Sequence, residues 1–135
     1  MTATSSPIAA TAAAALLRRA IAAHNFSAAD RTLVDAVTRI TTSDSDVPAD
    51  ALEEPASTGD ARYDTLLATS YAFALLQRHL TPAPWMLAAP AVDSEWLWDG
   101  DTEATTAFRD FIRDRTPKLF LDKNILLRER DLYAP

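Results

Sequence analysis

The sequence predicts an all-α fold, a small domain of four main helices with an ordered loop rich in tryptophan and proline. Alanine, the strongest helix former, supplies about a fifth of the 135 residues. Apolar residues recur at steps of three and four in four stretches, as on the buried side of a helix. The chain is 48% hydrophobic and 24% charged, which is typical of a globular protein, and its length suits one compact domain.

The first two expected helices form an N-terminal helical pair over residues 1–41. One is expected over 7–24, with Ser6 as N-cap and a proline at the first helical position. The other is expected over 28–41, where Ser27 and the acid three residues later have the spacing of a capping box. Because alanine dominates the apolar side of the first helix, we expect that helix to approach a neighbour closely.

A break follows over residues 42–60, which carry six acidic residues and no basic one. Pro48 and Pro55 exclude a continuous helix there. We expect an acidic, solvated connector rich in proline and serine, and the sequence leaves open whether it is ordered without a partner. The connector leads to a helical region over 61–135.

The third helix, expected over 61–80 with Asp60 as its cap, has the clearest periodicity. The loop over 81–100 holds three tryptophans, and we expect it to be ordered because indole rings need packing partners. The fourth helix is expected over 102–115, capped by Asp101. Its apolar stripe is expected to face the core and comprises Ala104, Ala107, Phe108, Phe111 and Ile112.

The C-terminal end is expected to be short and partly extended. Residues 119–121 and 125–127 are apolar and flank Asp-Lys-Asn at 122–124, which suits a tight turn. This pattern predicts a short C-terminal hairpin, followed by a final helical turn over 127–132.

The composition excludes several kinds of chemistry. Without cysteine the chain has no thiolate zinc site and no cysteine nucleophile, and two glycines cannot build a phosphate-binding loop. No Gly-x-Ser-x-Gly or Ser-x-x-Lys motif is present. His24 and His79 lie near the ends of expected helices, where the helix dipole favours a cation, so we interpret them as surface residues. We therefore predict no catalytic residue, no metal and no cofactor.

Charge and hydropathy constrain the partner. Thirteen basic and nineteen acidic residues give a net charge of −6, which repels a phosphate backbone unless basic residues are segregated. They are only mildly enriched over 109–130, so nucleic-acid binding is not favoured. The apolar run over 8–17 is too short to span a bilayer, and basic residues follow it, opposite to their place in a signal peptide. We expect no membrane association and a cytoplasmic location.

The three tryptophans are the most informative candidates, since tryptophan is enriched at interface hot spots. Trp96 and Trp98 are two residues apart, which places both rings on one side of an extended segment, and Trp85 lies between two prolines. Two interpretations stay open: the rings cover the core, or they form a partner groove or ligand pocket. We name all three as candidate partner-binding residues.

Basic residues near the C-terminus are further candidates. Their interleaving with Asp110 and Asp114 is usual for a salt-bridged, solvent-exposed helix face. The alternative is a patch for an acidic partner or phosphate, and its partner-binding residues would be Arg109, Arg113, Lys118 and Lys123, with Arg115 beside them.

Acidic residues surround the tryptophan loop. They lack the spacing of an EF-hand, so we interpret them as a solvated rim rather than as metal ligands. They are Asp93, Glu95, Asp99, Asp101 and Glu103.

Several short motifs of the second half are similar to those of a known family. They are Arg-Tyr-Asp-Thr-Leu-Leu-Ala at 62–68, Pro-Ala-Pro-Trp at 82–85, Pro-Lys-Leu-Phe at 117–120 and Lys-Asn-Ile-Leu at 123–126. Together they resemble the C-terminal region of actinobacterial antitoxin-like proteins that accompany nucleotidyltransferase-type toxins. The likeness spans residues 61–132.

The resemblance implies neutralisation of a cognate toxin by protein contact, with no catalytic site carried over. Such proteins often begin with a helix-turn-helix, but the first sixty residues here hold four arginines against eight acids, whereas a recognition helix is normally basic. Direct DNA binding is therefore not favoured.

Our leading hypothesis is a non-catalytic, antitoxin-like protein that binds a partner protein. One alternative is a DNA-associated transcriptional regulator or accessory subunit that uses the basic C-terminal third. A second is a small hydrolase or transferase that uses the acidic loop. The sequence leaves the partner's identity and the oligomeric state open.

Overall fold

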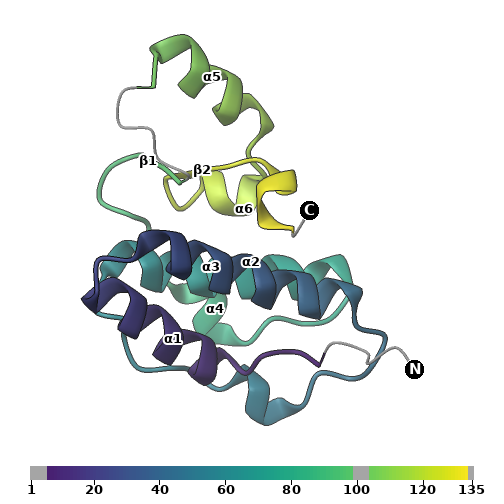
Figure 1. Ribbon diagram of the computed structural model, residues 1–135. Helices are drawn as coiled ribbons and strands as arrows, with labels where there is room; N and C mark the ends of the chain where they lie inside the picture. The colour runs from purple at the N-terminus through teal and green to yellow at the C-terminus, as the bar shows by residue number, and fades with distance from the viewer. Residues whose placement is uncertain (1–5, 99–103, 134–135) are drawn as a thin grey trace.

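The computed structural model describes residues 6–98 and 104–133, and it confirms the all-α class. Helices make up 60% of the structure and strands 3%. Figure 1 shows a helical body below and a smaller part above it. We call the described residues from Trp96 onward, which form this smaller part, the C-terminal part. No helix within the described ranges combines the length and the apolar character needed to cross a bilayer.

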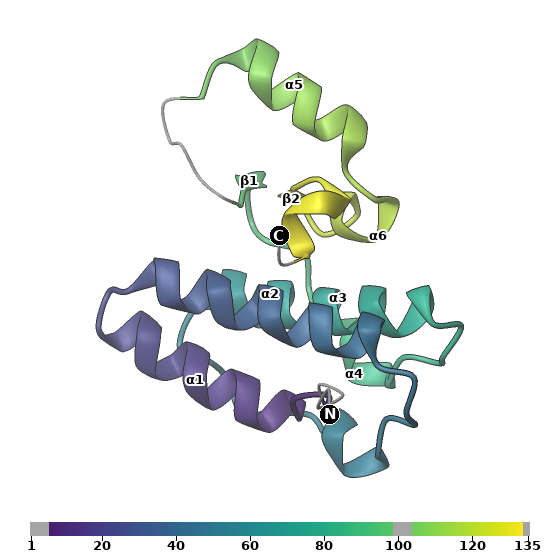
Figure 2. The same cartoon turned by 45° about the vertical axis from the view of Figure 1, so that its right-hand side comes forward.

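Three helices form the body: α1 (Ala10–Ala22), α2 (Phe26–Thr42) and α3 (Ala61–Gln77). They lie side by side, and each contacts the other two (Figures 1 and 2). Fully buried alanines on α1 and α2 let the helix backbones approach closely. The hydroxyl of Tyr71 on α3 donates to the carbonyl of Ile8 at 2.7 Å, so the segment before α1 is tied to α3. The predicted N-terminal pair thus shares one core with the region that follows residue 60.

The helix α3 lies at the centre of the molecule. Every residue from 65 to 75 is buried, on all sides of the helix. The short helix α4 (Pro84–Ala88) contacts one side of it. The helix α6 (Lys118–Leu121) contacts another, where the rings of Phe73 and Phe120 lie 5.6 Å apart.

The observed helix starts match the predicted ones only where the capping residue was predicted correctly. The predicted cap of α3 is confirmed, since Asp60 Oδ1 accepts the backbone N–H of Arg62 at 2.8 Å. The cap of α2 is wrong: the side chain of Asn25, not Ser27, accepts a backbone N–H. The start of α1 is also wrong, because Ile8 is held before the helix by Tyr71 and neither Ser6 nor the proline after it begins the helix.

The ends of α1 and α3 are closed by the two histidines. His24 has a φ of 55° and His79 a φ of 58°, the left-handed conformation in which helices commonly end. In both cases the next backbone N–H donates to the carbonyl five residues earlier, at 2.8 and 2.9 Å. Both histidines are exposed, which confirms their interpretation as surface residues at helix ends.

The acidic connector is ordered and tied to the body. It contains the 3-10 helix η1 (Ala49–Leu52), and Thr58 is buried within it. The guanidinium of Arg18 on α1 donates to the carbonyl of Ser57, with Nη2 at 2.7 Å. Apart from Asp60, the acidic side chains of the connector are exposed, as expected. They are Asp44, Asp46, Asp50, Glu53 and Glu54.

The C-terminal part holds a small parallel sheet where a hairpin was predicted. The strand β1 (Trp96–Leu97) pairs with β2 (Ile125–Leu126), and Trp96 lies opposite Ile125. Residues 118–121 are helical, and the carbonyl of Pro117 accepts the backbone N–H groups of Phe120 and Leu121, both at 3.0 Å. The hairpin prediction was wrong because the partner of β2 lies far back in the tryptophan loop.

The helix α5 (Thr106–Arg115) projects from this sheet, at the top of Figures 1 and 2. It begins later than predicted, with the side chain of Thr105 accepting the N–H of Phe108 at 3.1 Å. The predicted cap, Asp101, lies outside the described residues. The expected final helical turn is present as the 3-10 helix η2 (Glu129–Leu132).

Candidate functional site

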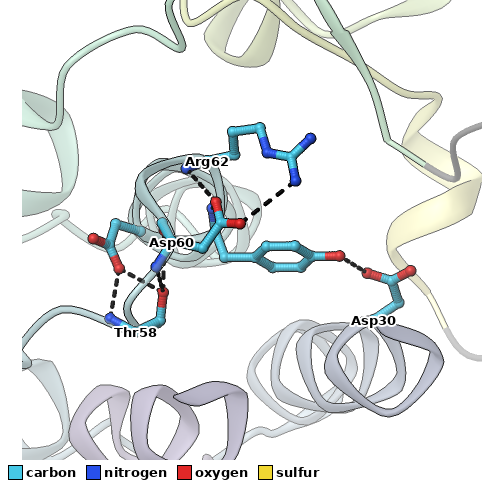
Figure 3. Close-up of polar contacts among 6 residues, drawn as sticks. Asp30, Thr58, Asp60 and Arg62 are labelled. Atoms are coloured by element: carbon cyan, nitrogen blue, oxygen red, sulfur yellow. Dashed lines mark hydrogen bonds and ion pairs between the residues drawn. The ribbon is translucent and has the colours of Figure 1, made fainter. Parts of the chain in front are cut away.

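Two of the three tryptophans help to join the body to the C-terminal part. The indole Nε1–H of Trp98 donates to Oδ1 of Asp30 on α2 at 2.8 Å. The hydroxyl of Tyr63 on α3 donates to the same oxygen at 2.9 Å, and Figure 3 shows this bond reaching from α3 to α2. One carboxylate thus connects two body helices and the segment after β1.

Trp96 packs against the same joint. Its ring meets the Tyr63 ring edge-on with 5.3 Å between centroids, and the guanidinium of Arg62 lies 4.9 Å from its centroid. Asp60 holds that guanidinium at 3.4 Å, as Figure 3 shows. Trp96 and Trp98 therefore lie together, as the sequence predicted, and both pack against the main core.

The chemistry of this joint is that of a neutral hydrogen-bond donor. Burial, and then the negative charge of Asp30, raise the pKa of Tyr63 above the ordinary value of 10.0. The phenol therefore keeps its proton at neutral pH and serves to position Asp30 and Trp96.

Trp85 lies elsewhere, on α4 against the connector. Its indole Nε1–H donates to the carbonyl of Leu52 at 2.8 Å. The three rings accordingly do not form one surface, which contradicts the interpretation in which they form one partner groove. Trp85 instead lines a pocket of about 350 Å³ between the connector, α3 and α4.

The predicted basic patch is divided among local contacts. Arg113 pairs with Glu95 at 2.6 Å and with Asp110 at 2.5 Å. Lys118 pairs at 2.9 Å with Asp122, the residue that follows its own helix. These contacts agree with the first interpretation of the basic residues, a salt-bridged and solvent-exposed helix face, and not with the alternative of a binding patch.

The remaining two basic candidates differ from each other. The ammonium of Lys123 donates to the carbonyls of Leu87 and Ala89, so it holds the end of α4. Arg109 forms no ion pair with any residue that the structure describes. The four side chains therefore do not converge on one site.

Among the described residues of the C-terminal part, the most exposed large apolar side chains lie on α5. Phe108 is 44% exposed and Phe111 is 41% exposed, and their rings stack with 6.3 Å between centroids. The guanidinium of Arg115 lies 3.7 Å from the centroid of the Phe111 ring. We call these three residues the α5 face.

The α5 face overturns the predicted orientation of this helix. Ile112 is the buried residue of α5, and it packs on Leu97 and Leu126 of the small sheet. Two strands of two residues cover only one side of a helix, so the phenylalanines are left outside. The apolar stripe could be recognised from the sequence, but its orientation could not.

The acidic rim does not form a metal site in the described part of the chain. Glu95 pairs with Arg113, and Asp93 is exposed. No group of three His, Cys, Asp or Glu side chains that could hold a metal ion occurs among the described residues. The other predicted members, Asp99, Asp101 and Glu103, lie outside them.

Comparison with known proteins found no relative of this chain. No protein-family model matches it, and neither the curated proteins nor the solved structures include a match. The functional argument therefore depends on the residues themselves.

Proposed function

We propose that this chain is a non-catalytic, antitoxin-like protein of the cytoplasm that neutralises a cognate toxin by direct contact. The observation that carries the proposal is the α5 face, two stacked phenylalanines exposed on a projecting helix. The antitoxin class comes from the sequence resemblance over 61–132, and the face supplies a docking surface for it.

The energetics of the face favour binding. Burial of a phenylalanine side chain is worth about 1.5–3 kcal/mol, and aromatic and arginine anchors dominate protein interfaces. Phe111 and Arg115 are already held against each other, and the Arg115 guanidinium donates to the carbonyl of Phe111 at 3.1 Å. Less side-chain entropy is lost on binding when the anchors are held in advance.

Charge favours a basic protein partner. The chain carries a net charge of −6, and the carboxylates of the connector are exposed. Complementary charge speeds the encounter of two proteins. Arg113, Lys118 and Lys123 already bond within the chain, which favours a protein partner over DNA.

Co-expression with the product of the adjacent gene tests the proposal. We expect the two proteins to elute as one complex from size exclusion. The double variant Phe108→Ser/Phe111→Ser should lose the complex while keeping the helical circular dichroism of the parent chain, because both rings are outside the core.

Leu16→Ser is the matched control, since Leu16 on α1 is also 44% exposed. It should leave the complex intact. Separate elution of the parent chain and its neighbour, or a complex that survives in the double variant, contradicts the proposal.

A further inference from the structure

The pocket beside Trp85 lies between the connector, α3 and α4, and none of its lining residues belongs to α5. Its volume is about 350 Å³, and α4, which forms one wall, lies below α3 in Figures 1 and 2 while α5 lies at the top. The pocket combines an indole, two carboxylates and rigid apolar walls. The lining residues used below are Glu54, Pro55, Asp64, Trp85 and Pro90.

Among the described residues, no basic side chain donates to either carboxylate of the pocket. Asp64 accepts hydrogen bonds from the hydroxyl of Ser57 at 2.6 Å and from the N–H and hydroxyl of Thr58, both at 2.7 Å. All these donors are neutral. Within the described part of the chain, neither Asp64 nor Glu54 forms an ion pair.

Two basic side chains border the pocket, but each donates to a backbone carbonyl of the lining. Arg18 donates to Ser57, and Lys123 donates to Ala89. They hold the backbone at Ser57 and Ala89 in place, and within the described residues neither of them forms an ion pair with Glu54 or Asp64.

The aromatic wall is held in the same way. The indole N–H of Trp85 is bonded to the Leu52 carbonyl at 2.8 Å, which sets the position of the ring. The hydroxyl of Thr65 donates to the carbonyl of Pro90 at 2.7 Å and fixes that edge. A cation is attracted by an indole and by a carboxylate alike, and binding costs less when both are positioned in advance.

We propose that this pocket binds the ammonium or guanidinium end of an organic cation with a short alkyl stem. The charged end pairs with Glu54 and Asp64, and the stem lies against Trp85 and the prolines. The site is separate from the α5 face and does not depend on the toxin-binding proposal.

Nuclear magnetic resonance of the ¹⁵N-labelled chain tests the site. The three indole N–H signals are separate probes, and Trp85→Phe identifies the relevant one. The probes are N-acetyl-lysine methylamide, N-acetyl-arginine methylamide and the neutral N-acetyl-norleucine methylamide, at constant ionic strength. We expect both cationic probes, and not the neutral one, to shift the Trp85 signal saturably, with a dissociation constant on the order of 1 mM.

Glu54→Gln should weaken the lysine probe about fivefold. Glu53→Gln is the matched control, since Glu53 is also exposed and does not line this pocket, and it should leave the affinity unchanged. An equal shift with the norleucine probe, equal affinity in Glu54→Gln, or no shift with any cation overturns the proposal.

Cadaverine distinguishes two sources of the cation. Tighter binding of cadaverine than of the lysine probe indicates a free diamine, because its second ammonium reaches the second carboxylate. Tighter binding of the lysine probe indicates a side chain presented by a protein. The titration uses this chain alone, so its result is independent of whether a toxin complex forms.

Discussion

The helical body and the C-terminal part differ in how much of each helix they bury. In the body, α3 is buried on all sides from residue 65 to residue 75. In the C-terminal part, α5 buries Ile112 and leaves both phenylalanines exposed. A helix surrounded by neighbours contributes its apolar side chains to stability, whereas a helix resting on a small sheet keeps apolar side chains available for binding.

The largest expected effect is in the body. Leu66→Ala removes a fully buried side chain of α3 and should lower the free energy of unfolding by about 3 kcal/mol. Phe111→Ala on α5 should lower it by less than about 0.5 kcal/mol, as expected at the surface. Urea unfolding followed by circular dichroism measures both, and equal losses would remove the contrast between the two regions.

The joint between the regions is tested at Asp30. Asp30→Ala leaves the Tyr63 hydroxyl and the Trp98 indole N–H without this acceptor, and we expect a loss of about 2 kcal/mol. Asp35→Ala on the same helix removes an exposed ion pair with Arg39 and should cost less than about 1 kcal/mol. Urea unfolding measures the loss in the free energy of unfolding for both variants. Similar losses would show that the joint contributes little to stability.

Alkaline pH should weaken the body through its buried tyrosines. Burial raises the pKa of Tyr63 and of Tyr71 above 10.0, so the folded state retains two protons that the unfolded state releases. Stability from each phenol is complete below pH 10 and falls above it, by about 1.4 kcal/mol at pH 11. Urea unfolding between pH 8 and 11 should show this fall, and Tyr63→Phe should reduce it; an unchanged profile in that variant would contradict the assignment.

A smaller effect concerns two buried hydroxyls of α3. Ser70 is fully buried, and its Oγ, like Oγ1 of Thr69, has no hydrogen-bond partner in the described structure. Ser70→Ala should raise the free energy of unfolding by about 1 kcal/mol, since an unpaired hydroxyl no longer has to be desolvated. Ser27→Ala is the control, because Ser27 is exposed on α2 and its replacement changes helix propensity without removing a buried hydroxyl. If Ser27→Ala raised the free energy of unfolding as much as Ser70→Ala, helix propensity would explain the whole gain.

The smallest effect is expected at the end of α3. His79→Gly removes the strain of a left-handed non-glycine residue, but glycine also gives the unfolded chain more conformational freedom. The first effect is larger, so the free energy of unfolding should rise by about 0.5 kcal/mol. Gln77→Gly, within the helix, should lower it by about 1 kcal/mol. Thermal unfolding of the two variants should therefore shift in opposite directions, and shifts of the same sign would be inconsistent with the observed helix end.

The helices were largely predictable because their signals are local. Asp60 and the spacing that follows it were enough to place α3. Alanine content placed α1 to within a few residues, and the spacing of apolar residues placed α2 equally well. The errors at Ser27 and at the start of α1 arose where a neighbouring residue or a distant tyrosine took the capping or anchoring role.

The candidate site was predictable only in part. The closeness of Trp96 and Trp98 followed from their spacing, and the exposed position of the histidines followed from their place at helix ends. The separation of Trp85, the internal pairing of Arg113 and the exposure of Phe108 did not follow, because each depends on a residue far along the chain or on the area of the surface beneath α5.

The sequence by itself determined that the chain is helical and which stretches form the main helices, because helical hydrogen bonds join residues only a few positions apart. The tertiary structure alone decided that residues 125–126 pair with residues 96–97 and that the phenylalanines of α5 face outward. Those outcomes depend on which distant segments come into contact and on how much surface area they bury against each other. Neither quantity can be inferred from a local sequence pattern.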